Sequence, residues 1–218
     1  MGTDGDAAPV RRAARAAAVL ASAAVIAVGL VALVHDRAQP AIAASQHAER
    51  LKQLTAILGD VAYDNDPAAD TVLVRDAERL GTPDAVLAHR VRRAGQPVAV
   101  LLNVVAPEGY AGAIHLLVAI GADGRVLGVR VLGHRETPGL GDFIEERRSD
   151  WIHHFDGRSL GDPPPARWRV SKDGGDFDQY TGATVTARAV THAVRNALDY
   201  FERNRATLLA PAQTRDAP

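Results

Sequence analysis

Residues 114–132, with the sequence IHLLVAIGADGRVLGVRVL, contain the pattern that decides the fold. Two runs rich in aliphatic residues, 114–120 and 125–132, flank a short turn at 121–124. This turn contains an Asp-Gly step, which is a strong signal for a β-hairpin when it lies between two such runs. The sequence therefore predicts two adjacent antiparallel strands in the middle of the chain.

Alternation along the second run predicts which side chains face the core. In an antiparallel sheet with one buried face, every second residue points to the same side. The face expected to be buried consists of Leu127, Val129 and Val131, and the opposite face consists of Gly128 and Arg130.

Other segments predict an α+β fold, in which an antiparallel sheet is packed against helices. Apolar side chains at helical spacing predict an amphipathic helix over residues 184–203. Apolar runs at 71–74 and 97–105 predict further strands. Residues 144–155 have the composition of a helix, and 168–170 that of a short strand.

A helix is also expected just before the sheet. Ser45 is a suitable N-cap for a helix with Leu51, Leu54 and Leu58 at helical spacing, and Gly59 is a suitable stop.

Residues 16–34 form an uncharged apolar run of 19 residues in which Ser22 is the only polar side chain. As an α-helix the run would span about 28 Å, which is close to the roughly 30 Å of bilayer hydrocarbon. Arg11, Arg12 and Arg15 precede it, so the positive-inside rule keeps the N-terminus in the cytoplasm.

The expected domain plan follows from this run. We expect a cytoplasmic N-terminus at 1–15, a transmembrane anchor at 16–34, an extracytoplasmic domain at 38–210 and a flexible tail at 211–218. One alternative is a cleaved signal peptide, because Ala41-Ile42-Ala43 offers an A-x-A cleavage site. The other alternative to a membrane anchor is a buried helix of a soluble protein.

Composition excludes several classes of function. A content of 47% hydrophobic residues with a net charge of −1 excludes intrinsic disorder and gives no overall basicity that would predict a nucleic-acid partner. The absence of cysteine excludes disulfides, iron–sulfur ligation and a thiol nucleophile. The glycines at 139 and 141 lack the third glycine of a dinucleotide-binding fingerprint. We assign no residue as a catalytic acid or base, nor as a metal ligand.

The segment 178–186, with the sequence DQYTGATVT, is the best candidate for a functional site. It places Thr184 and Thr186 where a loop enters the C-terminal amphipathic helix. A threonine there can cap the helix. The same helix N-terminus can instead bind a phosphate group, because its N–H groups and dipole favour an anion. Gly182 and Ala183 would let such a group approach the backbone.

Asp178-x-x-Thr181-Gly182-Ala183-Thr184 resembles the acceptor motif D-x-x-[ST]-G-A-T of FMN-binding domains that carry flavin covalently. The resemblance implies that FMN is joined through its phosphate to the hydroxyl of Thr184, with Thr181, Gly182 and Ala183 beside it. It also implies a separate flavin transferase that uses FAD as donor and recognises Asp178.

Upstream, Glu136-Thr137-Pro138-Gly139-Leu140-Gly141 resembles a segment of the G subunit of Rnf (also called Rsx) ion-translocating electron-transport complexes. Because this loop leaves a strand end and contains permissive residues, Glu136, Thr137 and Gly139 are candidates to line the flavin ring. Turn formation explains Gly139 equally well. Arg130, Arg135 and Lys172 are candidates to place charge near a reduced ring, although solvent-facing cations explain them too.

The resemblance implies a relay rather than an autonomous enzyme. Electrons would pass between ferredoxin and NAD through several subunits, and partner membrane and iron–sulfur subunits would move the ion. The expected location is the bacterial inner membrane, with a single span and a periplasmic C-terminal domain. Two alternatives stay open: the related C subunit of sodium-pumping NADH:quinone reductase, and a flavin-bearing module that senses redox state.

Overall fold

The computed structural model describes residues 7–211, without the side chains of residues 7–26, 36, 40 and 41. Most of the predicted tail lies outside these residues. The chain divides into two compact units, Met1–Glu49 and Arg50–Pro218. The second unit contains the sheet and every candidate site residue.

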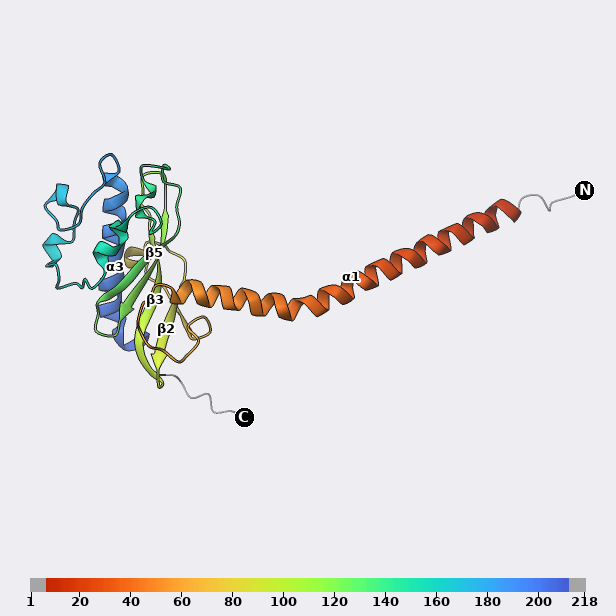
Figure 1. The fold of residues 1–218 in the computed structure, drawn as a ribbon, viewed down its shortest axis with the longest axis horizontal. Helices are drawn as coiled ribbons and strands as arrows, with labels where there is room; N and C mark the ends of the chain where they lie inside the picture. The colour runs from red at the N-terminus through yellow and green to blue at the C-terminus, as the bar shows by residue number, and fades with distance from the viewer. Residues whose placement is uncertain (1–6, 212–218) are drawn as a thin grey trace, which may run out of the picture. The chain divides into compact units, whose positions relative to one another are not determined.

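The second unit is built on one five-stranded antiparallel sheet in the order β1-β2-β3-β4-β5 (Figure 1). Each strand therefore pairs with its neighbour in the chain. Helices pack on the sheet, which confirms the predicted α+β class. The strands are β1 (Thr71–Val74), β2 (Val86–Arg93), β3 (Gln96–Ala106), β4 (Ile114–Gly121) and β5 (Val126–Gly133).

The predicted hairpin is present as β4 and β5, and Val129 and Val131 face the same core cluster as predicted, but the facing predicted for Leu127 is wrong. The register shifts from Ala119 opposite Gly128 to Ile120 opposite Val126, so Leu127 is an extra residue in the strand. Such a bulge reverses the alternation on one side of it. Val129 therefore shares its core cluster with Val126, whereas Leu127 packs on the other face of the sheet.

Strand β2 was not predicted, because its sequence is rich in basic residues. Arg90 Nε and Arg92 Nε lie 2.7 and 2.5 Å from the two carboxylate oxygens of Asp70. Arg92 is only 2% exposed. Pairing with one carboxylate thus allows two arginines to occupy a strand in the middle of the fold.

The two faces of the sheet are covered by different segments. Helix α3 (Thr184–Leu208) packs on one face and buries Val190, Val194 and Phe201 there. This confirms the predicted C-terminal helix and extends it by five residues beyond Arg203. The opposite face is covered by Leu54, Ile57 and Leu58.

The short helical segments differ from the predictions for this region. The predicted helix at 144–155 is replaced by two 3-10 segments, because the Ser149 hydroxyl donates to the Phe143 carbonyl and accepts from Trp151 N, starting a new turn. The predicted strand at 168–170 is reduced to one bridge between Val170 and Phe177. The remaining helices are α2 (Ala77–Leu80), η1 (Asp142–Ile144), η2 (Asp150–Phe155), η3 (Pro165–Arg167) and η4 (Ser171–Asp173).

Helix α1 (Ala7–Thr55) is continuous through the position at which Ser45 was expected to begin a new helix. That prediction is wrong, because the alanine-rich sequence around Ser45 favours continuation of the helix. Gly59 lies beyond the helix end and adopts a left-handed conformation with φ of 54°.

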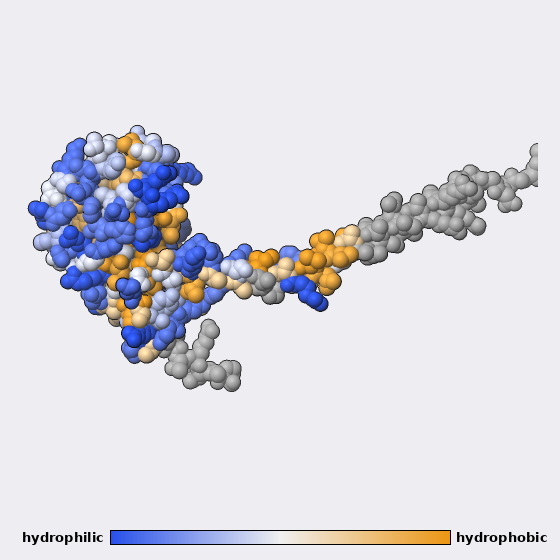
Figure 2. Space-filling view, viewed as in Figure 1, coloured by the Kyte–Doolittle hydropathy of each residue, from blue (hydrophilic) through white to orange (hydrophobic). Residues whose placement is uncertain are grey.

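Within the residues described, we find no helix with an apolar stretch long enough to cross a lipid bilayer. The predicted span 16–34 begins with residues 16–26, whose side chains lie outside the description. Its remaining part exposes apolar side chains along α1, shown in orange in Figure 2. These exposed residues are Val28, Leu30, Val31, Leu33 and Val34.

Burial of His89 predicts a pH dependence of stability. Its Nδ1 lies 2.9 Å from the Pro67 carbonyl oxygen, and desolvation lowers the pKa of the imidazole below its ordinary value. In the unfolded chain His89 therefore becomes protonated near the ordinary histidine pKa of about 6.5. In the native chain the same imidazole is protonated only at lower pH. The free energy of unfolding should fall as the pH drops below that value toward the folded-state pKa.

Urea unfolding of the wild type and of His89→Gln at pH 7.5 and 5.5 checks this expectation. The variant should lose less stability between the two pH values than the wild type. His192→Gln, which alters an exposed histidine on α3, is the control. Equal pH dependence in the wild type and His89→Gln would contradict the assignment.

Candidate functional site

The candidate motif forms a tight turn that leads into α3. Ala183 N donates to the Tyr180 carbonyl at 2.9 Å, which closes the turn. Gly182 has φ of +87°, a conformation that favours glycine. A side chain at this position would also place its Cβ 3.1 Å from Leu140 Cδ1. The glycine of the motif is therefore required by backbone conformation and by close packing.

Thr184 is the first residue of α3, and neither candidate threonine caps the helix. The N-cap position is occupied by Ala183, which supplies no side-chain hydrogen bond. Thr184 is half-buried, and its hydroxyl makes no hydrogen bond to any residue that the structure describes. The first turn thus combines N–H groups without a side-chain cap with a hydroxyl that has no structural partner among those residues.

The other residues of the motif differ in exposure. Thr181 and Gly182 are exposed, and Ala183 is buried beneath them. Asp178 is also exposed, and its backbone carbonyl accepts a hydrogen bond of 2.6 Å from Trp151 Nε1. This bond fixes the start of the motif while leaving the Asp178 carboxylate at the surface.

Glu136 lies below the motif and is 3% exposed. One carboxylate oxygen accepts from Ala111 N at 2.9 Å, and the other accepts from the Thr186 hydroxyl in the first turn of α3. The β3–β4 loop, the loop after β5 and the start of α3 therefore meet at one carboxylate. Gly141 is packed against the same group, because a Cβ there would lie 2.8 Å from Glu136 Cβ.

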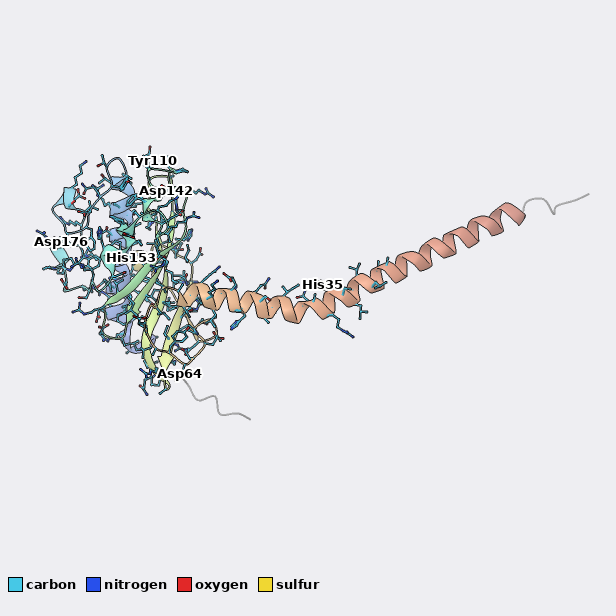
Figure 3. All side chains as sticks on the ribbon, viewed as in Figure 1. His35, Asp64, Tyr110, Asp142, His153 and Asp176 are labelled. Carbon is cyan, nitrogen blue, oxygen red and sulfur yellow. The ribbon has the colours of Figure 1, made fainter. Side chains whose placement is uncertain are left out.

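Residues 137–140 of the loop after β5 are exposed. Thr137 and Gly139 both lie at the surface, and Gly139 is bonded to Asp142, which Figure 3 labels. The Thr137 carbonyl accepts from Gly141 N at 2.8 Å, and Gly139 N donates to Asp142 Oδ1 at 2.8 Å. The structure thus brings the two sequence-predicted segments together, with Glu136 buried between them.

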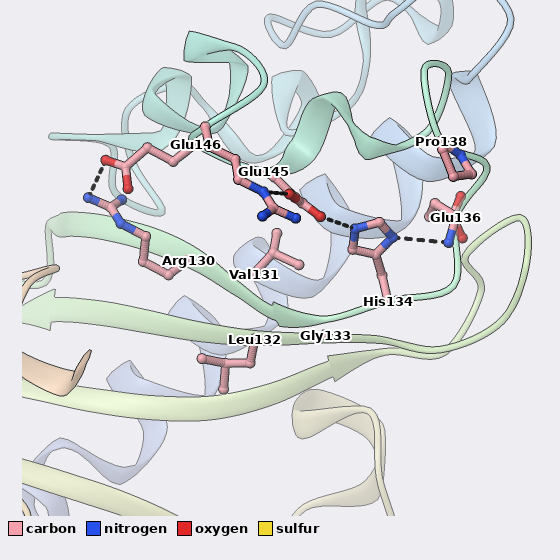
Figure 4. A pocket seen from close by; sticks show the side chains of 10 residues that line it. Arg130, Val131, Leu132, Gly133, His134, Glu136, Pro138, Glu145 and Glu146 are labelled. Atoms are coloured by element: carbon pink, nitrogen blue, oxygen red, sulfur yellow. Dashed lines mark hydrogen bonds and ion pairs between the residues drawn. The ribbon is translucent and has the colours of Figure 1, made fainter. Parts of the chain in front are cut away.

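A groove of about 580 Å³ runs beside β5 and the loop that follows it (Figure 4). In this groove Glu136 N donates to His134 Nδ1, so the proton of the neutral imidazole is on Nε2, which lies 2.8 Å from Glu145 Oε1. Hydrogen bonds from Arg147 and His134 lower the pKa of Glu145 to about 2. The carboxylate is therefore ionised at neutral pH and orients His134.

The three candidate cations are at different places. Arg130 lines the groove and is paired with Glu146 at 2.7 Å. Arg135 and Lys172 are exposed. Thus the Arg130 guanidinium is already engaged within the domain.

Sequence reasoning missed the bond between Thr186 and Glu136. Thr186 lies on the apolar stripe of α3, one turn before Val190, and is 1% exposed. A hydroxyl on a core-facing stripe requires a buried partner. That position was a usable signal, but the identity of the partner depends on how the loop after β5 folds back.

Comparisons with known proteins show the family to which this chain is similar. A family model described as "FMN-binding domain" matches residues 109–199. The G subunit of the ion-translocating oxidoreductase complex of Pseudomonas aeruginosa (strain UCBPP-PA14) is 50% identical over 208 residues, covering 95% of this chain and 97% of the relative. The G subunits of the same complex from Shewanella baltica (strain OS223) and Cereibacter sphaeroides (strain ATCC 17023) are 44% and 42% identical. They cover 88% and 85% of this chain, and 91% and 83% of their own lengths.

The chain belongs to the family of G subunits of ion-translocating oxidoreductase complexes. This membership confirms the resemblance seen in the sequence and favours it over the C subunit of sodium-pumping NADH:quinone reductase. In this family member the FMN-binding match extends from the loop containing Ala111 into α3. It therefore includes the whole junction around Glu136.

The residues present fit FMN. A phosphate group needs N–H donors and a favourable dipole, and the first turn of α3 offers both. Among the residues described, the Thr184 hydroxyl in this turn is unengaged and could contact such a group. Gly182 adds no side chain to the turn that precedes Thr184.

The Glu136 junction gives a stability prediction. Thr186→Val removes the hydroxyl donor and leaves a buried carboxylate oxygen without that donor, which should lower the free energy of unfolding by about 1–3 kcal/mol. Thr191→Val is the matched control, because Thr191 is equally buried on α3 but its hydroxyl donates to the Ala187 carbonyl of its own helix.

Urea unfolding of the two variants provides the measurement. Thr186→Val should be the less stable variant by at least about 1 kcal/mol. If both substitutions cost the same, the carboxylate does not depend on Thr186.

Proposed function

We propose that this chain carries FMN as a phosphoester on Thr184 and uses it to relay electrons within an ion-translocating oxidoreductase complex. The single observation that carries the proposal is the half-buried Thr184 hydroxyl, which lies at the uncapped start of α3 and has no hydrogen-bond partner among residues 7–211 as described. Membership of the G-subunit family and the FMN-binding match support the same function.

Attachment is a group transfer that changes no oxidation state. Thr184 Oγ1 would form a bond to the FMN-side phosphorus of FAD, the phosphoanhydride bond would break, and AMP would leave with the hydroxyl proton released to solvent. We assign this step to a separate flavin transferase. Asp178 directly follows buried Phe177, and its own backbone is anchored by Trp151, so its exposed carboxylate is accessible for recognition by that enzyme.

The domain's own residues would hold the cofactor in place. The first turn of α3 would stabilise the remaining negative charge of the phosphodiester. Thr181, Gly182 and Ala183 would shape the turn beside it, while exposed Thr137 and Gly139 would lie along the ring. Glu136 would support this arrangement from below rather than contact the ring, because both of its oxygens are engaged. When bound, FMN supplies the one- and two-electron chemistry.

A relay needs donors and acceptors that this chain does not provide. We propose other membrane and iron–sulfur subunits of the complex as these partners, and we assign ion translocation to the membrane subunits. Support comes from the relatives, which are named as subunits of a complex.

We also propose a membrane anchor at 16–34, with residues 1–15 in the cytoplasm and the 38–210 domain on the periplasmic side of the bacterial inner membrane. Support comes from the exposed apolar side chains of α1, among them Val28, Leu30 and Val31. At 3.6 residues per turn the five exposed residues between 28 and 34 point to all sides of the helix. A helix that is apolar all round is typical of a buried or membrane environment.

Flavin attachment is tested with variants of the acceptor residue. After co-expression with a flavin transferase, the intact mass of the wild type should increase by one FMN less one water. Thr184→Val keeps the shape of the side chain but lacks the hydroxyl, so it should gain nothing, whereas Thr184→Ser should be loaded. Thr207→Val is the control, because it removes an exposed hydroxyl near the other end of α3 and leaves the 178–184 motif intact. A loaded Thr184→Val protein would refute the proposed linkage.

The anchor is tested by extraction and by mass. Full-length protein should stay in the membrane fraction at alkaline pH and should retain its N-terminal residues, whereas a cleaved signal peptide would leave a chain starting after Ala43. Changing both Val25 and Val28 to Arg should release protein, because both lie near the centre of the 16–34 span, where each charge costs about 2.5–3.5 kcal/mol. Leu73→Arg, at an exposed position of β1, should release none.

A further inference from the structure

Tyr180 has one ring face fixed by the core and a side chain that is 49% exposed. Its ring stacks on Phe143 with centroids 4.9 Å apart and planes inclined by 13°. Phe143 is buried and packs edge-on against Trp151, with centroids 5.0 Å apart. A surface tyrosine is thus held flat by a buried aromatic pair, although its own hydroxyl is not needed for that packing.

The position of Tyr180 places it beside the proposed attachment point. The hydrogen bond from Ala183 N to the Tyr180 carbonyl folds the chain back, so that Tyr180 and Thr184 flank a single turn. Leu140 approaches the same turn at Gly182 and is 38% exposed. Val185, the residue after Thr184, is 43% exposed. Apolar surface is therefore gathered around the hydroxyl at the start of α3.

We infer that the outward face of Tyr180 is the stacking surface for the isoalloxazine ring of the flavin carried on Thr184. The inference rests on the proposed function and deepens it by naming the residue that receives the ring. Flat aromatic systems prefer offset stacking, and a tyrosine supplies a large face with few rotatable bonds. Because Phe143 already orders Tyr180, little side-chain entropy remains to be lost when a second ring stacks on it.

Tyr110 is the other exposed tyrosine at this end of the domain (Figure 3). It is 71% exposed, and we find no ring contact to it within residues 7–211. An unsupported ring must lose its own rotamer freedom on stacking, so Tyr110 is the weaker candidate and serves as a matched control.

The arrangement has a consequence for electron transfer. A ring stacked on Tyr180 has one face covered by the protein, while its other face is open. An electron-transfer partner would then approach the flavin from that open face, and the phosphoester at Thr184 would remain on the domain.

Flavin fluorescence tests the inference on the full-length flavinylated protein in detergent. A tyrosine phenol in contact with an excited flavin quenches its emission by electron donation. We compare emission per bound flavin in the wild type, Tyr180→Leu, Tyr180→Phe and Tyr110→Leu, each normalised to the same sample unfolded in guanidinium. Intact mass gives the flavin content of every sample.

The expected result is strong quenching in the wild type that is relieved in Tyr180→Leu. Loss of the stack should lower the ratio of stacked to unstacked flavin roughly two- to tenfold. Tyr180→Phe keeps the stack but removes the phenol, so its emission should rise while the visible circular dichroism of the bound flavin is retained. Tyr110→Leu should match the wild type in both signals.

The outcomes separate this inference from the proposed function. If every protein carries flavin on Thr184 but Tyr180→Leu has the emission and circular dichroism of the wild type, the stacking surface is wrong and the carrier function stands. Relief of quenching in Tyr110→Leu instead of Tyr180→Leu would also overturn the inference. If the wild type gains no flavin from an active transferase, both fall together.

Discussion

The buried carboxylate of Glu136 is the interaction on which the site depends. It receives one hydrogen bond from the β3–β4 loop, through Ala111 N, and another from the first turn of α3, through the Thr186 hydroxyl. Buried polar oxygens are tolerated only when they are hydrogen-bonded, so the three segments are held to one arrangement. Thr184 is two residues from Thr186, and its place at the surface is therefore set by a contact in the core.

Helix α3 both packs on the sheet and presents the candidate site at its first turn, and the second role costs helix stability. Along its length, buried residues such as Val190 and Phe201 fix it to the sheet. At its start, Ala183 occupies the position where a serine, threonine or aspartate cap would contribute about 1 kcal/mol. The helix therefore lacks that stabilisation. Among the residues described, no side chain caps its first N–H groups or bonds to the Thr184 hydroxyl. This is the pattern expected where a phosphate group, rather than a side chain, completes the helix end.

The sequence predicted elements whose signals are local, and it failed where the outcome depends on distant contacts. The β4–β5 hairpin and α3 follow from turn chemistry and from apolar periodicity. The bulge at Leu127 has no such signal, because it arises from the pairing of two strands. Strand β2 was missed because its sequence is rich in arginine. Only the folded chain shows that Arg90 and Arg92 are paired with Asp70, about 20 residues earlier in the sequence. The motif at 178–184 located the candidate acceptor, but only the folded chain shows that Glu136 supports it from below.

The central claim is that Thr184 is the flavin-bearing residue of this domain. The most direct measurement is peptide mapping by fragmentation mass spectrometry of the wild-type protein purified from its native membrane. The account predicts one fluorescent peptide spanning residues 178–188, with the mass of FMN less water localised to Thr184. Flavin localised to any other residue, or a protein that releases all its flavin on denaturation, would contradict it.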